Sequence, residues 1–394
     1  MERKSSKRGN TQEKSPNKRH KKNQRPGDEG SSNGVSGASN RACDELEKTI
    51  NAKIKEILET ETNSVEKKAK VLVYQNRCLR HTAAIGEVKI FDDLIEVTDI
   101  DVNTTNKEGQ TPLILASQAG HTEIVKKLLA NKHTDVEAID QHGYTALMHC
   151  ATNNHVQVLR LLLARNSQNI NHKNLVQCSA LVLASNRGHP EVVKELLAQS
   201  AIEVNSEDES GDSALIHSAE EGHVKVVQLL LAHPTIKVNH KNSNGDVSLM
   251  CASNRGHEVI VEKLLKEQKI TVNVKNNDGY TALMCAADKG NARVMDLLLA
   301  HRDMDINIAD ENNDTALNWA VDKEHKEIVR KIFGHGAVDK TNKRNVKAIK
   351  THLQQGKSNS RDFAFESPLI SAIEDGEEEI VRWLLDHEDV QINR

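Results

Sequence analysis

The sequence predicts an all-α repeat solenoid, built as a stack of helix-turn-helix units with hairpin tips and preceded by a disordered basic tail. Three observations predict it: a recurring motif, helical spacing of the apolar residues within each copy, and an N-terminal segment with almost nothing to bury. The motif reads "SALVLASNRGH" at Ser179 and "VSLMCASNRGH" at Val247. Because one catalytic centre needs one set of groups, a second copy indicates repeated architecture.

The N-terminal tail, residues 1–42, is rich in Lys, Arg, Ser, Asn and Gly, and we expect it to be disordered. Residues 1–27 carry ten Lys and Arg against two Glu, a net charge of +8, so the rest of the chain carries −4 − 8 = −12. Within the tail, "KRHKK" is a candidate nuclear-import signal formed by Lys18, Arg19, Lys21 and Lys22. Nonspecific contact with nucleic acid and a merely solvated tail are the alternatives.

An N-terminal helical segment is expected over residues 43–74. From Asp44 to about Thr60 the apolar residues recur at helical spacing with charged residues between them. A second helix continues through Val65, Ala69 and Leu72.

The repeats follow over residues 75–333, with one degenerate copy at Arg77 and then seven copies spaced by 34 residues. The regular copies begin at Thr111, Thr145, Ser179, Ser213, Val247, Thr281 and Thr315. Residues 334–366 lack half a unit, because the equivalent leucines 317 and 369 are 52 residues apart, or 34 plus 18. Residues 367–394 form a final repeat.

Each unit has the same predicted parts. Thr or Ser caps a short first helix, and a Gly in left-handed conformation ends it. A second helix follows, such as "EIVKKLLA" from Glu123, whose Ile124, Val125, Leu128 and Leu129 form one apolar stripe. A β-branched segment and an Asn-Gly or Asp-Gly turn then form the hairpin tip.

The repeated unit resembles the ankyrin-repeat family, whose consensus runs from a turn through Thr-Pro-Leu-His to paired helices. The resemblance covers about residues 75–394. Two features depart from the family pattern: the His after Thr-Pro-Leu is replaced in every copy, and the Gly-Ala after the second helix survives only in "GHGAVD" at 334–339. The resemblance implies a protein-binding solenoid.

Composition and motifs argue against several other functions. Aromatic residues are 2% of the chain, which disfavours an aromatic-lined cofactor pocket, and no nucleotide-binding or catalytic signature occurs. We therefore expect no enzyme activity and no cofactor. Six scattered cysteines, no secretory signal and no membrane span predict a soluble intracellular protein of the nucleus or cytoplasm.

A row of histidines recurs at one position of the unit: His121, His155, His189, His223, His257 and His325. Neighbouring units pack about 8–10 Å apart, whereas two zinc ligands must lie within about 4 Å of each other. The row therefore cannot share a metal, and loop hydrogen bonding is the expected role. By the same distance Cys251 and Cys285 cannot form a disulfide.

The resemblance implies that partners contact the hairpin tips and the two residues before the Gly between the helices. Among the residue pairs before that Gly, the candidates are Asn186, Arg187, Glu221, Asn254, Arg255 and Lys289. Arg187, Glu221 and Arg255 alternate in sign, which fits either a solvated row of weak ion pairs or a polar groove for a peptide of matching charge order.

At the tips the candidates are Tyr144, Tyr280, Leu175 and Val176. Tyrosine offers both contact area and a hydroxyl. Leu175 and Val176 stand where other tips are polar, and Gln177 fills the Gly position; this pair is either a binding hot spot or folds back onto a neighbouring tip.

We therefore predict a scaffold or adaptor that binds proteins through the concave face and tips of the array. The alternatives are a nuclear regulator whose basic tail contacts nucleic acid while the repeats hold a protein, and a regulatory subunit that inhibits an enzyme. Nucleic acid is expected to contact only the tail, and no membrane is expected as a partner.

Overall fold

The fold is described from a computed structural model that covers residues 36–60, 63–165, 169–339, 342, 344–345, 347–349, 372 and 378–385. The chain divides into two compact units, residues 1–48 and 49–394. The predicted tail up to residue 35 lies outside the described residues, and with it the candidate import residues Lys18, Arg19, Lys21 and Lys22. No helix in the described part of the chain combines the length and apolar character needed to span a bilayer.

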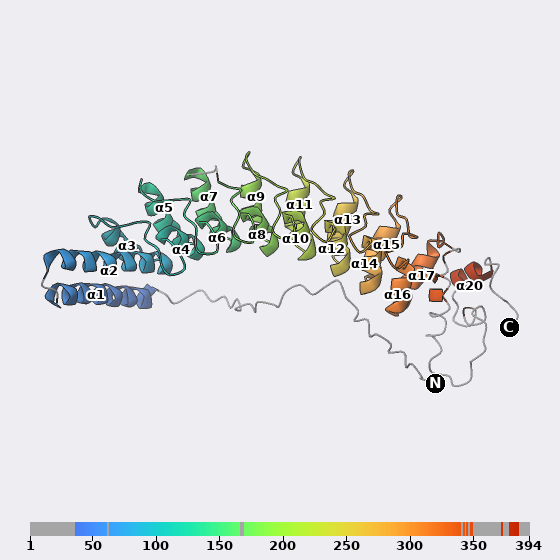
Figure 1. The fold of residues 1–394 in the computed structure, drawn as a ribbon, viewed down its shortest axis with the longest axis horizontal. Helices are drawn as coiled ribbons and strands as arrows, with labels where there is room; N and C mark the ends of the chain where they lie inside the picture. Colours follow the sequence, from blue (N-terminus) through green and yellow to red (C-terminus); the bar gives the residue numbers. More distant parts are fainter. Residues whose placement is uncertain are drawn as a thin grey trace, which may run out of the picture. The chain divides into compact units, whose positions relative to one another are not determined.

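The described residues are helical throughout, apart from turns and two isolated antiparallel bridges, Ile139 with Thr145 and Glu207 with Ser213. The helices, labelled in Figure 1, are α1 (Ser36–Thr60), α2 (Ser64–Ile85), α3 (Val88–Ile95), α4 (Pro112–Ala119), α5 (Thr122–Ala130), α6 (Ala146–Thr152), α7 (Val156–Arg165), α8 (Ala180–Arg187), α9 (Pro190–Leu197), α10 (Ala214–Glu220), α11 (Val224–Leu231), α12 (Ser248–Arg255), α13 (Glu258–Leu265), α14 (Ala282–Lys289), α15 (Ala292–Leu299), α16 (Ala316–Asp322), α17 (Lys326–Gly334) and α20 (Glu378–Leu385). An all-α repeat stack is therefore what the sequence builds.

The N-terminal helices differ from the predicted boundaries. Helix α1 begins at Ser36 instead of Asp44, so it includes the last residues of the predicted tail. Helix α2 runs without a break across the boundary expected at residues 74 and 75. Its sequence contains no Gly or Pro between the Asn63 cap and the left-handed Gly86 that ends it. The first helix of the degenerate repeat is thus the C-terminal part of α2.

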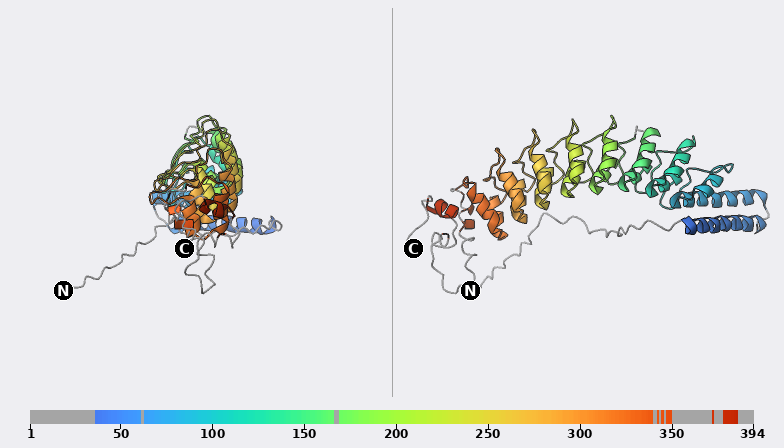
Figure 2. Two further views of the ribbon diagram at one scale, coloured as in Figure 1. Left: turned by 90° about the vertical axis from the view of Figure 1, so that its right-hand side faces the viewer. Right: turned by 180° about the vertical axis from the view of Figure 1, so that it is seen from behind.

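Two layers of helices form the repeat stack, as Figures 1 and 2 both show. The first helices of successive units pack in one row from α2 through α4 to α16, and the second helices pack in a parallel row from α3 through α5 to α17. Each first helix also packs on the second helix of its own unit. In α5, Ile124, Val125 and Leu128 are fully buried, as the apolar stripe predicted, and Leu129 is partly exposed.

The caps of the first helices confirm the predicted role of Thr and Ser. A side-chain oxygen accepts from the backbone N–H three residues later at Thr111, Thr145, Ser179, Ser213 and Thr281. Thr315 forms a capping box with Asn318, and Val247 has no side-chain cap.

The histidine row forms loop hydrogen bonds, as predicted. Each ring Nε2 lies 2.9–3.2 Å from a backbone carbonyl of the preceding unit. In the unit without the His, the Asn291 amide donates to the Ser253 carbonyl at 2.7 Å. The Gly that ends the first helix leaves room for the ring of the next unit: a Cβ on Gly188 would lie 2.4 Å from Nδ1 of His223. The Gly of "ASNRGH" therefore accommodates the ring of the next unit, and its His bonds a carbonyl of the preceding unit.

A second ladder links the loops after the second helices. The side chain of Asn205 donates to the Thr235 carbonyl at 2.8 Å and accepts from the Lys237 N–H at 2.8 Å. The same pair of bonds occurs at Asn103, Asn171, Asn239, Asn273 and Asn307. These bonds tie each of these units to the next. At the equivalent position 137 the residue is Glu, whose carboxylate accepts from the Asn169 amide instead.

Beyond α17 the structure describes only parts of the predicted half-repeat (334–366) and final repeat (367–394). Residues 344–345 and 347–349 are helical, with Ile349 fully buried, and Arg344 pairs with Asp314 at 2.6 Å. Helix α20 packs against α17. Besides these and Gly334 of α17, the described part of the two segments consists of residues 335–339, 342 and 372.

We predict that Gly188→Ala lowers the free energy of unfolding by roughly 1–3 kcal/mol, because it places a Cβ at positive φ and against the His223 ring. Gly334→Ala is the matched control, since Gly334 ends α17 with nothing within 4 Å of an added Cβ. Thermal and denaturant unfolding of both variants would measure the difference. Equal stability of the two would contradict the contact.

Candidate partner-binding surface

The tips between the units are turns that share one hydrogen-bonding design. An Asp or Asn opens each tip, and its Oδ1 accepts from the backbone N–H groups two and four residues later. The opening residues are Asn106, Asp140, Asn174, Asp208, Asn242, Asn276 and Asp310. The predicted hairpin tips are therefore present in every unit from residue 106 to residue 314.

Neighbouring tips are joined through their backbones. The Leu175 N–H donates to the His142 carbonyl at 3.1 Å, and the Glu209 N–H donates to the Val176 carbonyl at 3.1 Å. Equivalent bonds link the other consecutive tips from residue 108 to residue 311. The tips thus form one continuous row whose side chains face outward together.

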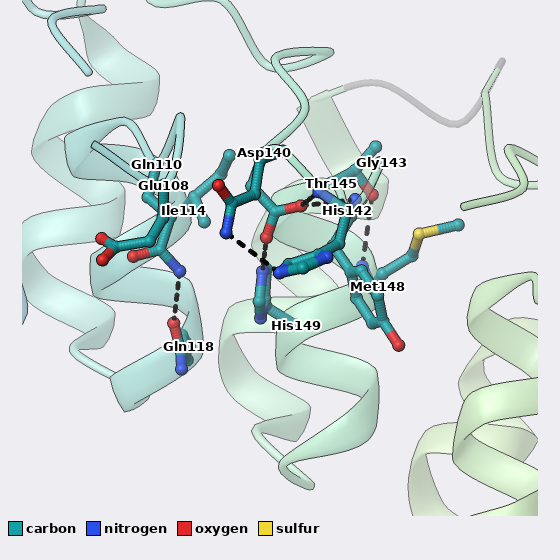
Figure 3. A network of polar contacts seen from close by, with 12 residues as sticks. Glu108, Gln110, Ile114, Gln118, Asp140, His142, Gly143, Thr145, Met148 and His149 are labelled. Atoms are coloured by element: carbon teal, nitrogen blue, oxygen red, sulfur yellow. Dashed lines mark hydrogen bonds and ion pairs between the residues drawn. The ribbon is translucent and has the colours of Figure 1, made fainter. Parts of the chain in front are cut away.

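The type of residue found nine positions after the Asp or Asn that opens a tip (the opener) depends on which of the two it is. Where the opener is Asp, this residue is a donor: His149 Nε2 is 2.9 Å from Asp140 Oδ2, His217 is 2.9 Å from Asp208, and Trp319 Nε1 is 3.1 Å from Asp310. Where the opener is Asn, the corresponding residues are Leu115, Leu183, Cys251 and Cys285. Figure 3 shows Asp140 held between its own tip and the His149 ring. The extra carboxylate oxygen is satisfied only where a donor is present.

One of these pairs belongs to a cluster with the composition of a metal site. One ligand atom each from Asp208, Asp212 and His217 lies within 4.8 Å of the others. The hydrogen bonds from His217, Asp212 N–H and Ser210 N–H outweigh burial and keep the pKa of Asp208 below its usual value. Asp212 accepts from the Asn242 amide at 2.7 Å. These bonds already use the ligand atoms, so we assign the cluster a structural role.

The described cysteines are free thiols, including Cys251 and Cys285. Burial raises the pKa of Cys285 to about 12, and burial with nearby Asp208 and Glu209 raises the pKa of Cys178 to about 12. Burial also raises the pKa of Cys150 and Cys251. Such thiols stay protonated at neutral pH and are poor nucleophiles and metal ligands.

The predicted tip residues fall into two places. Tyr144, Leu175 and Val176 line one groove of about 490 Å³, which spans three consecutive tips. The other lining residues are Glu108, Gln110, Asp140, Gln141, His142, His149 and Asn174. Leu175 and Val176 are 70% and 42% exposed, so they do not fold back onto a neighbouring tip. This exposure favours the hot-spot interpretation of the pair.

Tyr280 lies away from that groove, at the tip before α14, and its ring packs on Trp319 with centroids 5.0 Å apart. The Lys323 ammonium lies 5.8 Å from the Trp319 ring centroid and 3.6 Å from an Asp288 oxygen. Burial and the carboxylates of Asp310, Asp288 and Asp278 raise the pKa of Tyr280. Its contacts are therefore already made within the chain.

The residues before the inter-helix Gly do not behave as one row of ion pairs. Arg255 pairs with Glu220 of the preceding unit at 2.8 Å, not with Glu221. Lys289 pairs with Asp288 at 2.5 Å. Arg187 and Glu221 are exposed and have no ion pair or side-chain hydrogen bond within the described residues. Of the four charged candidates in this row, the two without an ion pair, Arg187 and Glu221, lie on neighbouring units in the middle of the array.

The two asparagines of the row also differ. Asn186 is half-buried, and its amide lies 2.9 Å from Nδ1 of His217 in the next unit. Asn254 is half-buried, and its carbonyl accepts from the Asn291 amide at 3.3 Å. Both residues serve contacts between units as well as the surface.

Sequence reasoning missed Glu108, Gln110, His142 and His149 in the groove, and Trp319 beside Tyr280. One signal was available for two of them: the donor at the ninth position appears only after an Asp opener. Glu108, Gln110 and His142 had no such signal, because tip residues vary freely from copy to copy.

Comparison with known proteins agrees with this geometry. A family model described as ankyrin repeats matches in three copies, at residues 79–174, 166–242 and 249–345, which is more than half of the chain. A similar solved structure is the ankyrin repeat domain of Bcl-3, described as a unique member of the IkappaB protein family, at 29% identity and a TM-score of 0.50. That match covers 56% of this chain and 96% of the other. No curated protein matches.

We predict that His217→Leu lowers the free energy of unfolding by about 1–3 kcal/mol, because it leaves the Asp208 Oδ2 without its donor. Adding Asp208→Asn should recover part of the loss, since Asn106 with Leu115 already forms this combination in the chain. Denaturant unfolding of the two variants checks the coupling. Strictly additive losses would show that the pair does not interact.

Proposed function

Since the chain belongs to the ankyrin-repeat family, we propose that it is a non-catalytic scaffold or adaptor that binds partner proteins through its tips and first helices. Ankyrin arrays present an extended surface for protein-protein interaction. One observation carries the proposal. The positions that recur in the copies of the motif make contacts between units, whereas the tip residues and the residue before the Gly differ from copy to copy. A partner would therefore be recognised by these variable residues, which the fold does not require.

The middle of the array is the favoured contact region. Arg187 and Glu221 are exposed without ion pairs among the described residues, and Leu175 and Val176 are exposed at the tip of the same region. Toward the C-terminus, Arg255, Lys289 and Lys323 are each paired with an acidic residue within the chain. A partner can bind an unpaired charged side chain without breaking an ion pair within the chain.

We predict that Arg187→Glu reduces the recovery of crosslinked cellular partners about tenfold without loss of helical circular dichroism. Lys225→Glu is the matched control, because Lys225 is an exposed cation on α11 in the other helical layer. Quantitative mass spectrometry of crosslinked neighbours would compare the two. The same partner set at the same yield for both variants would refute the assigned face.

The charge of the tail favours a second candidate function, in which the protein acts in the nucleus and its basic segment contacts nucleic acid. Residues 1–27 carry a net charge of +8. Counterion release makes such contacts strong at low salt and weak at high salt. We propose a location in the nucleus or cytoplasm on the same ground.

We predict that replacing Lys18, Arg19, Lys21 and Lys22 by Ala moves a fluorescent fusion of the full chain from nucleus to cytoplasm. The same variant in a DNA shift assay at low and moderate salt tests the contact with nucleic acid. Unchanged distribution contradicts the import signal, and unchanged, salt-independent mobility contradicts the nucleic-acid contact.

A further inference from the structure

The tip at residues 174–178 departs from the design that the other tips follow. Its Leu175 and Val176 expose apolar surface to water. Its Gln177 has φ +61°, the left-handed conformation that Asn313 supplies in one other tip and Gly in five: Gly109, Gly143, Gly211, Gly245 and Gly279. Each departure costs stability in the free protein: exposed apolar side chains gain nothing from burial, and a side chain at positive φ is strained.

A third departure is the amide of Asn174. In two other units the tip amide donates to an acidic residue of the preceding tip, Asn242 to Asp212 and Asn276 to Asp246, each at 2.7 Å. The corresponding residue before Asn174 is Tyr144. Asn174 is 2% exposed and its Nδ2 has no hydrogen-bond partner.

Tyr144 lies beside this amide without satisfying it. Burial raises the pKa of Tyr144, with Cys178 adding to the rise and the nearby Asn174 side chain opposing it. The hydroxyl is therefore close to Asn174, yet Nδ2 makes no bond of acceptable geometry. A buried donor left unpaired destabilises the free protein, so an acceptor brought to this point would be favoured.

These departures meet in one place. Asn174, Leu175, Val176 and Tyr144 all line the groove of about 490 Å³, and Glu108 lines it from the tip two units before that of Asn174. Proteins break their own local rules mainly at functional sites, because binding recovers what folding does not. The groove offers an apolar wall, a polar floor that lacks an acceptor, and a carboxylate.

We propose that this groove binds an extended segment of a partner protein, which places an apolar side chain against Leu175 and Val176 and a main-chain carbonyl beside Asn174 and Tyr144. The inference rests on the proposed scaffold function and names the chemistry of the partner. Nδ2 is closed to water in the free protein, so the carbonyl reaches it only if the Tyr144 side chain, whose ring packs on His149 with centroids 5.2 Å apart, moves aside. Glu108 disfavours acidic residues in the segment.

The test uses the full chain and a displayed library of random twelve-residue peptides. The key variant, Leu175→Ser with Val176→Asn and Gln177→Gly, gives this tip the residues of the tip at 243–245. Because it restores the common design, it should melt no lower than the unmodified chain. Asn244→Ala, an exposed residue of another tip, is the matched control.

We expect selected peptides to share an apolar residue, to be depleted in Asp and Glu, and to bind the tip variant at least about tenfold more weakly than the Asn244→Ala control. Asn174→Asp, which keeps the Oδ1 acceptor that the tip needs and replaces only the Nδ2 donor, should also weaken them. Peptides that bind the tip variant unchanged, or a library that yields none, would overturn the proposal. So would a lower melting temperature of the tip variant, because the tip residues would then be structural.

The result separates this inference from the function on which it rests. Peptides that lose binding on Arg187→Glu but not on the tip variant remove the groove as the site and leave the scaffold function standing. A set of cellular partners unaffected by either change contradicts both.

Discussion

The hydrogen bond between a histidine ring and a carbonyl of the preceding unit, made by Asn291 in one unit, is the contact on which the array depends. In most units a Gly ends the preceding first helix and leaves room for the ring, since a Cβ on Gly188, Gly120 or Gly222 would meet it. The bond of His189 forms where that position is Asn154, which is also at positive φ. The asparagine side chains in the loops after the second helices, and the backbone bonds between neighbouring tips, also link each of these groups to the next unit. No unit can satisfy these groups alone, so stability is shared between neighbours and a local defect weakens two interfaces.

Function follows from what this constraint leaves free. Positions that hold units together admit few residue types, whereas tips and the residue before the Gly change from copy to copy. Toward the C-terminus these free positions are spent on ion pairs within the chain, at Arg255, Lys289 and Lys323. In the middle of the array, Arg187 and Glu221 form no ion pair within the described residues, and Leu175 is exposed at its tip. The proposed binding surface is thus the region where these side chains have no ion pair or burial within the described part of the chain.

The candidate site could be predicted only in part. Leu175 and Val176 stood out because the seven tips opened at residues 106 to 310 can be compared within a single chain, and a departure is visible against six others. Tyr144 was chosen for its chemistry, and the structure places it in the same groove. Trp319 went unnoticed although its partner Asp310 marked it, and Tyr280, chosen for the same chemistry as Tyr144, proved to be packed on it.

The sequence by itself determined the repeat period, the caps, the left-handed glycines and the helical pairs, because these depend on residues a few positions apart. It also determined that the histidines bond loops and not a shared metal, from the spacing of units alone. Only the tertiary structure decided that α2 runs through the expected boundary, that Arg255 chooses Glu220 over Glu221, and that three tips enclose a groove. Those outcomes join side chains about one period apart, and their distances are set by how each unit is rotated against the next.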